Sequence, residues 1–100
     1  MSFSDLARSR FSVRKFDGRP VKKSCLKEII EAGRIAPTAK NQQPQKVYVI
    51  QSRDGIAKIN EVCQCIYGAS TVLLVCYDSN LVWTNPFNGQ TSGQIDCSIV

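Results

Sequence analysis

Histidine is absent from this sequence of 100 residues. Catalytic sites of the Ser-His-Asp and Cys-His types need an imidazole base, so neither can form within these residues. Metal sites built on histidine are excluded in the same way. The closest thiols, Cys63 and Cys65, have one residue between them, which is shorter than the usual zinc spacing, and on a helix they would face different directions. We therefore expect no metal site and ordinary packing for both cysteines.

Long apolar runs are also missing. The longest one, Val72 to Tyr77, is far shorter than the roughly 20 residues that a membrane-spanning helix needs. Residues 1–20 contain four arginines and no apolar stretch of the kind found in secretory signals. The five cysteines are an odd number, which favours reduced thiols. We expect a cytoplasmic protein without a membrane partner.

Acidic residues are scarce in the first half of the chain. Residues 1–46 contain eleven Lys and Arg against four Asp and Glu, whereas residues 47–100 contain two against four. The net charge of +5 therefore comes from the first half, which should attract anions. Charge alone fits a nucleic acid, an anionic membrane or a phosphorylated cofactor equally well.

Hydrophobic spacing and turn residues predict an order of helices and strands. Helices are expected over residues 2–9 with Ser2 as N-cap, from a cap at Ser24 to about Ala36, over 54–66, and from about Ser92 onward. Strands buried on both faces are expected over 47–50 and 71–77. Residues 79–93 are expected to form a long loop. This order predicts helices packed on a sheet, and the last helix, which reaches Val100 within its first turns, predicts a fragment of a longer protein.

Two polar segments could bind a ligand. In an extended segment Arg10, Ser12 and Arg14 share one face, where two guanidinium groups and a hydroxyl fit a phosphate monoester. The alternative for these residues is a solvated basic face. The second segment runs from Pro37 to Pro44 and is too polar to be core, so it is either a site-bearing loop or a plain helix-to-strand connection.

The order of these segments resembles the beginning of the nitroreductase family, whose members bind flavin mononucleotide (FMN). The matching parts, in chain order, are Arg-Phe-Ser-Val-Arg-Lys-Phe at 10–16, Ala32 to Ala39, Lys40 to Gln45 with the strand after it, Ala69-Ser70, and Asp96. The resemblance implies an α+β fold, a nitroreductase-like α-β-α sandwich with a mixed or mainly antiparallel sheet. Residues 1–100 would be the N-terminal part of a single flavin-binding domain, without the C-terminal half of the family.

The resemblance also implies roles for individual residues. Arg10, Ser12 and Arg14 would hold the phosphate and ribityl chain of FMN. Pro37, Thr38 and Asn41 would reach the flavin across the interface of a homodimer. NADH or NADPH would reduce the flavin, which would then reduce a small-molecule acceptor such as a nitroaromatic or quinone. No side chain is assigned as catalytic, because the cofactor supplies the hydride chemistry.

Three other functions stay open from the sequence. One is a reductive dehalogenase or flavin-fragmenting enzyme of the same superfamily with a different lid over residues 79–93, where Trp83 and Phe87 would stack on a substrate or pack over the sheet. Another is a basic module that binds nucleic acid through residues 8–27, although this segment has few aromatics and no known motif, so we expect no nucleic-acid partner. The third is an inactive anion-binding fragment.

Overall fold

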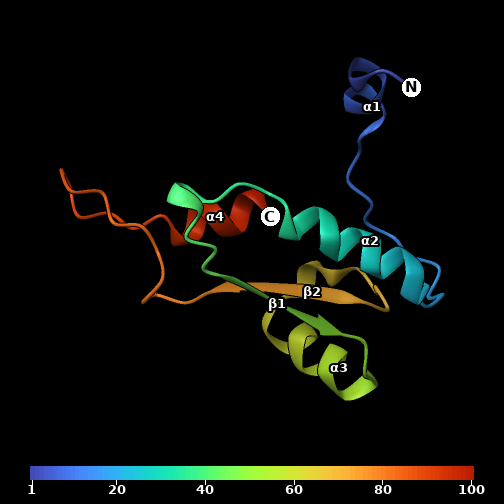
Figure 1. Ribbon diagram of the computed structural model, residues 1–100. Helices are drawn as coiled ribbons and strands as arrows, with labels where there is room; N and C mark the ends of the chain where they lie inside the picture. Colours follow the sequence, from blue (N-terminus) through green and yellow to red (C-terminus); the bar gives the residue numbers. More distant parts are fainter.

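The computed structural model describes all residues from 1 to 100 (Figure 1). Its helices are α1 (Phe3–Ser9), α2 (Lys23–Arg34), α3 (Arg53–Val62) and α4 (Gly93–Ile99). Its strands are β1 (Gln45–Ile50) and β2 (Val72–Tyr77), and two short 3-10 turns are η1 (Ala39–Asn41) and η2 (Gln64–Ile66). No helix is both long enough and apolar enough to cross a membrane. The combination of helices and a sheet confirms the predicted α+β class.

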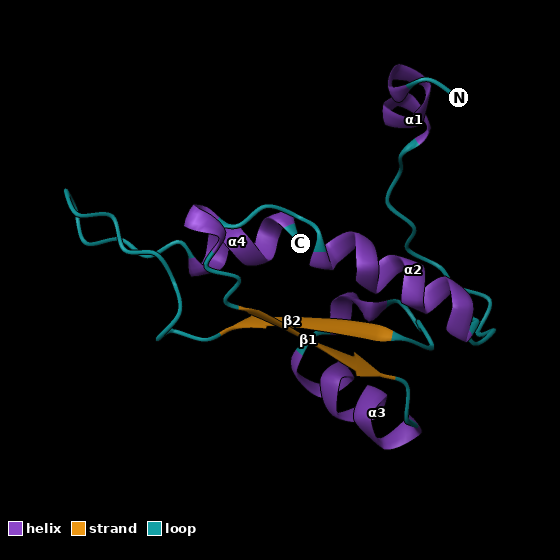
Figure 2. Ribbon diagram, viewed as in Figure 1, coloured by secondary structure: helices purple, strands orange, loops and turns teal.

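The two strands pair with each other in an antiparallel sheet. Gln45 lies opposite Tyr77 at one end of the ladder, and Ile50 lies opposite Val72 at the other. Both strands are rich in valine, tyrosine and other residues that favour extended backbone. Figure 2 shows α2 and α4 on one side of the sheet and α3 on the other. The layers are therefore helix, sheet and helix, which agrees with the predicted sandwich.

Local capping explains where α1 begins but not where α2 begins. The Ser2 hydroxyl accepts a hydrogen bond from the Asp5 N–H at 3.2 Å, and the Asp5 carboxylate accepts one from the Ser2 N–H at 3.1 Å. These two bonds confirm Ser2 as the N-cap and form a capping box with Asp5. The predicted cap of α2 at Ser24 is wrong, because Lys22 is the last extended residue (φ −60°, ψ 140°) and Ser24 already lies in the first turn.

The helix predicted over residues 54–66 is shorter than expected. α3 ends at Val62 because Cys63 has extended backbone (φ −142°, ψ 105°), although its N–H still bonds to the Ile59 carbonyl at 2.8 Å. The 3-10 turn η2 follows, and Tyr67 and Gly68 then have φ values of +51° and +74°. These two left-handed residues turn the chain toward β2.

Hydrophobic side chains are not buried in this chain. Only five residues are buried, and none of them is a hydrophobic core residue. The prediction of strands buried on both faces is therefore wrong. On β1, Tyr48 is 46% exposed, and on β2, Leu74 is 41% exposed. The physical reason is that the short helices present too little surface to cover both faces of the two-stranded sheet.

The start of α4 packs closely on the end of β2. A Cβ atom added to Gly93 would overlap the Tyr77 ring, so no larger residue fits there without a shift. Gly93 is buried, and it is the first residue of α4. The glycine therefore lets the start of α4 lie directly on the aromatic ring at the end of β2.

Candidate functional site

The predicted phosphate-binding residues lie on the segment that joins α1 to α2. Residues 10–22 form neither a helix nor a strand, and Arg10, Ser12 and Arg14 are all exposed. The Arg10 Nη1 donates to the Ser12 Oγ at 3.5 Å. The salt bridges in the structure involve other arginines, so neither guanidinium has a carboxylate partner. Both remain available to an anion.

The second predicted group lies on residues 37–44, which we call the 37–44 loop. Pro37 and Asn41 are exposed and Thr38 is half-buried. The Thr38 carbonyl accepts from the Asn41 N–H at 3.0 Å, and its hydroxyl oxygen accepts from the Gln43 N–H at 3.1 Å. Thr38 therefore closes the turn from inside, in addition to its predicted role toward a cofactor.

The backbone of this loop is unusual. Lys40, Asn41 and Gln43 have φ values of 52°, 53° and 53°, which is the left-handed region. Asparagine tolerates this region better than other residues with side chains, while lysine and glutamine adopt it at a cost of roughly 1–2 kcal/mol each. Such a conformation persists only where neighbouring contacts enforce it.

Hydrogen bonds at both ends attach the loop to the rest of the chain. At one end the Ala39 N–H donates to Asp96 Oδ1 at 3.0 Å. At the other end the carbonyl of buried Pro44 accepts from the Asp78 N–H at 2.9 Å. The exposed residues between these two anchors are thus held between α4 and the end of β2.

Asp96 also binds Ser92, and Ser92 binds the segment before it. Asp96 is 1% exposed and accepts from the Ser92 Oγ at 2.7 Å. The Ser92 Oγ in turn accepts from the Trp83 N–H at 3.1 Å. The sequence analysis used Asp96 only as a point of resemblance and Ser92 only as the start of a helix, and it did not predict the hydrogen bond between their side chains.

A cavity of about 290 Å³ lies where these segments meet. Its lining includes Ala39 from the 37–44 loop, Trp83, and the apolar side chains Ile95 and Ile99 of α4, with Asp96 behind them. The combination of an indole, aliphatic groups and a few polar side chains is typical of pockets for small organic molecules. Trp83 therefore lines a pocket, whereas Phe87 is 96% exposed and contributes nothing to it.

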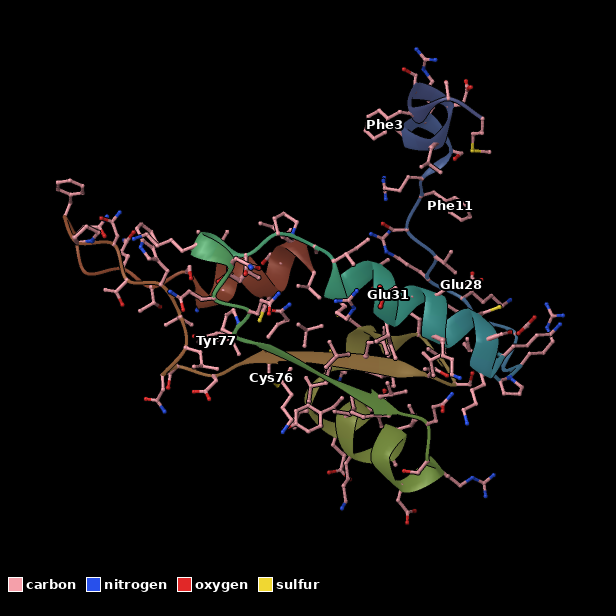
Figure 3. The ribbon with its side chains drawn as sticks, viewed as in Figure 1. Phe3, Phe11, Glu28, Glu31, Cys76 and Tyr77 are labelled. Carbon is pink, nitrogen blue, oxygen red and sulfur yellow. The ribbon has the colours of Figure 1, made fainter.

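The two predicted groups are not brought together within one chain. No hydrogen bond or salt bridge joins residues 10–14 to residues 37–44. In Figure 3 the labelled Phe11 marks the first segment, which rises from α2 toward α1, while the loop lies beyond the opposite end of α2, beside α4. The two groups therefore lie on separate segments of the chain, with no hydrogen bond or salt bridge between them.

The thiol next to Asp96 has an altered acidity. Burial raises the pKa of Cys97 above its usual value, with smaller contributions from Cys76 and from the Asp96 carboxylate. Cys76 and Cys97 line the same shallow groove between β2 and α4. All five cysteines are free thiols, and Cys25, Cys63 and Cys65 are exposed.

Comparisons with known proteins show the family and the fold of this chain. The model of the nitroreductase family matches residues 7–72. The crystal structure of a nitroreductase family protein from Clostridium difficile 630 is 43% identical, with a TM-score of 0.93 over 99% of this chain and 57% of that one. The structure of a nitroreductase from Desulfovibrio desulfuricans in complex with FMN is 27% identical, with a TM-score of 0.70 over 81% of this chain and 49% of that one.

A curated relative carries the provisional name NADH dehydrogenase/NAD(P)H nitroreductase. It comes from Methanothermobacter thermautotrophicus and is 29% identical over 99% of this chain and 51% of its own length. The chain thus spans about half the length of the relatives that it matches. On the family match, the chain belongs to the nitroreductase family, a family of oxidoreductases.

Proposed function

We propose that the protein is an FMN-dependent oxidoreductase that passes electrons from NADH or NADPH to a nitroaromatic, a quinone or a similar small acceptor. The observation that carries this proposal is the exposed pair of guanidinium groups, neither of which has a carboxylate partner, together with a hydroxyl two residues from each. In a family with a solved FMN complex, this donor set fits the phosphate of FMN.

Arg10 and Arg14 would neutralise the phosphate, because guanidinium groups bind phosphate oxygens through paired hydrogen bonds. Ser12 would add a hydroxyl donor, because its Oγ accepts from Arg10 and its own O–H stays free to donate. No acidic side chain competes for these groups in the structure. The segment therefore supplies charge and donors, which set affinity for the anionic end of the cofactor.

The 37–44 loop would hold the other end of the cofactor. Asn41 offers an amide donor and an amide acceptor, and Pro37 and Thr38 present a rigid edge beside it. Because residues 10–14 and the loop are apart within one chain, we propose that the site forms between two chains of a homodimer. Each cofactor would then touch the basic segment of one chain and the loop of its partner.

Bound FMN would supply the chemistry, accepting a hydride from the nicotinamide and passing the electrons on to the acceptor. The chain itself would bind, orient and exclude water. The 290 Å³ cavity beside the loop, with Trp83 in its wall, offers a flat apolar surface for an aromatic acceptor.

The test is the visible absorption spectrum of the full-length protein after addition of FMN and desalting. We expect a retained flavin band in the unaltered protein and its loss in the Arg10→Ala/Arg14→Ala variant. Hydrogen bonds to charged groups contribute about 1.5–3 kcal/mol each, so binding should weaken by roughly 100-fold or more.

The control is Arg53→Ala/Lys58→Ala, which removes the same charge from exposed positions of α3. This variant should keep its flavin. Equal loss of flavin in both variants would mean that Arg10 and Arg14 act only through the net charge of the protein and do not contact the phosphate. Absence of flavin from the unaltered protein would contradict the proposed function.

A further inference from the structure

The most buried side chain in the structure is a carboxylate. Asp96 is 1% exposed, and the structure contains no other side chain that is as fully enclosed. Its two oxygens accept one hydrogen bond each, Oδ1 from the Ala39 N–H at 3.0 Å and Oδ2 from the Ser92 Oγ at 2.7 Å. The Ala39 donor comes from a distant part of the sequence, and the Ser92 donor comes from the residue just before α4.

Burial of a carboxylate is costly unless hydrogen bonds replace the lost water. The cost explains why Asp96 constrains its surroundings, since movement of either donor would leave a charged oxygen without a partner. One of these donors lies 57 positions away in the sequence, in the 37–44 loop. The carboxylate thus joins a distant loop to the start of α4.

The 37–44 loop needs such a constraint. Lys40, Asn41 and Gln43 are left-handed, and the internal bonds to Thr38 close the turn without fixing its place on the sheet. Outside the loop, only Asp96 at one end and the Asp78 N–H at the other are hydrogen-bonded to it. Loss of the Asp96 bond would leave the loop attached at its Pro44 end alone.

Ser92 extends this connection to residues 79–91, which we call the arm. The Ser92 N–H donates to the Trp83 carbonyl at 2.9 Å, and the Trp83 N–H donates to the Ser92 Oγ at 3.1 Å. Farther out, the Asn85 N–H donates to the Gln90 carbonyl at 2.8 Å, so the arm is a hairpin-like excursion. The base of the arm and the 37–44 loop therefore meet at one pair of side chains.

We propose that Asp96 is a positioning residue that holds the 37–44 loop in its ligand-binding conformation, and that Ser92 couples this loop to the arm. The loop's role toward FMN rests on the proposed function. The coupling itself rests only on the hydrogen bonds. A ligand that enters the cavity between the loop and the arm would therefore change the protection of amides in both segments.

The experiment is amide hydrogen exchange by NMR on the full-length protein without cofactor, with three variants. In Asp96→Ala, protection of the Ala39 amide should fall by about 10- to 100-fold, because its charged acceptor is gone. In Asp96→Asn, which keeps an oxygen facing Ala39, protection should stay within about 3-fold of the unaltered protein. In Ser92→Ala, the Trp83 amide should lose protection, and the Ala39 amide should lose part of its protection as well, because Asp96 loses the donor that helps to hold it in place.

The FMN release rate after desalting is the second readout. It should rise by roughly 10-fold in Asp96→Ala and return close to the original rate in Asp96→Asn. A protein that binds no FMN but shows the expected exchange pattern would contradict the proposed function and support the coupling. Unchanged Ala39 protection in Asp96→Ala would overturn the coupling, whatever the flavin result.

Amides of β2 report whether Asp96→Ala still folds. If they lose protection as well, the other two variants decide the question. The proposal then requires that Ala39 stays protected in Asp96→Asn, and that both Trp83 and Ala39 lose protection in Ser92→Ala while the β2 amides keep theirs. Full protection of either Trp83 or Ala39 in Ser92→Ala would overturn it.

Discussion

Residues 10–14 and the 37–44 loop differ in how the chain holds them. The first segment has two unpaired guanidinium groups and no hydrogen bond to a distant residue. The second has one cation, Lys40, and is fixed at both ends by bonds to Asp96 and to the Asp78 amide. One segment therefore supplies positive charge, and the other supplies a fixed conformation.

This separation has an energetic meaning for binding. An exposed basic segment without long-range hydrogen bonds attracts an anion over some distance, but it loses side-chain and backbone freedom when it closes on that anion. A loop that is already fixed loses little further freedom. Changes in the two segments should therefore produce different effects. Four measurements test whether charge and fixed conformation are separated in this way.

The largest effect is expected from Gly93→Ala. This substitution changes the start of α4, the helix that holds the 37–44 loop through Asp96, and leaves residues 10–14 unchanged. The new methyl group would overlap the Tyr77 ring and push the start of α4 from the sheet. We expect a loss of about 1–3 kcal/mol in the free energy of unfolding, measured with denaturant. The exposed neighbour Gln94→Ala is the control, and similar losses in both variants would show that the contact with Tyr77 is unimportant.

The next effect is the salt dependence of FMN binding. Exposed charges are screened at high ionic strength, since the Debye length is about 10 Å at 0.1 M. Raising salt from 0.05 to 0.5 M should weaken binding several-fold, and the Arg10→Ala/Arg14→Ala variant should lose most of this dependence. Titration of flavin fluorescence measures both. A salt dependence that survives in the variant would place the important charges elsewhere.

A smaller effect is expected from Thr38→Val inside the loop. Valine keeps the shape of the side chain but removes the oxygen that accepts from the Gln43 N–H at 3.1 Å. The loss of one neutral hydrogen bond is about 0.5–1.5 kcal/mol, so FMN affinity should fall by roughly 2- to 10-fold with an unchanged salt dependence. Thr38→Ser should restore affinity, and its failure to do so would point to the methyl group instead.

The smallest effect concerns the thiol beside Asp96. Because burial raises the pKa of Cys97, it should react with iodoacetamide more slowly than exposed Cys63 at pH 8, and its reaction should rise over a higher pH range. The stability that this half-buried thiol contributes is present below the usual thiol pKa and is lost as pH rises through the raised value. Mass spectrometry of labelled peptides measures the rates. Equal labelling rates for Cys97 and Cys63 would mean that the contact between α4 and β2 opens often enough to expose Cys97.

Local signals predicted much of the fold. The N-cap at Ser2 and the start of α4 after Ser92 were predicted correctly, because they depend on residues within one turn. Both strands were also predicted in place, since β-branched and other apolar residues fill them. The break at Cys63 carries no glycine or proline, so nothing local announced it.

Long-range features could not be predicted in the same way. Burial of β1 and β2 depends on what covers the sheet, and Tyr48 and Leu74 show that here it is not covered. The bond between Ala39 and Asp96 joins residues far apart in the sequence, so a reading of neighbouring residues cannot find it. The predicted roles of Arg10, Ser12, Arg14, Pro37, Thr38 and Asn41 toward FMN stay predictions.

The contact between Gly93 and Tyr77 has a consequence for the history of the family. A mutation at either position is judged by the residue present at the other, because the ring occupies the space that a side chain at position 93 would need. Descendants that acquire a side chain there should first have exchanged the aromatic residue for a smaller one. Lineages should therefore show the two positions changing as a pair, with the substitution on β2 preceding the one on α4.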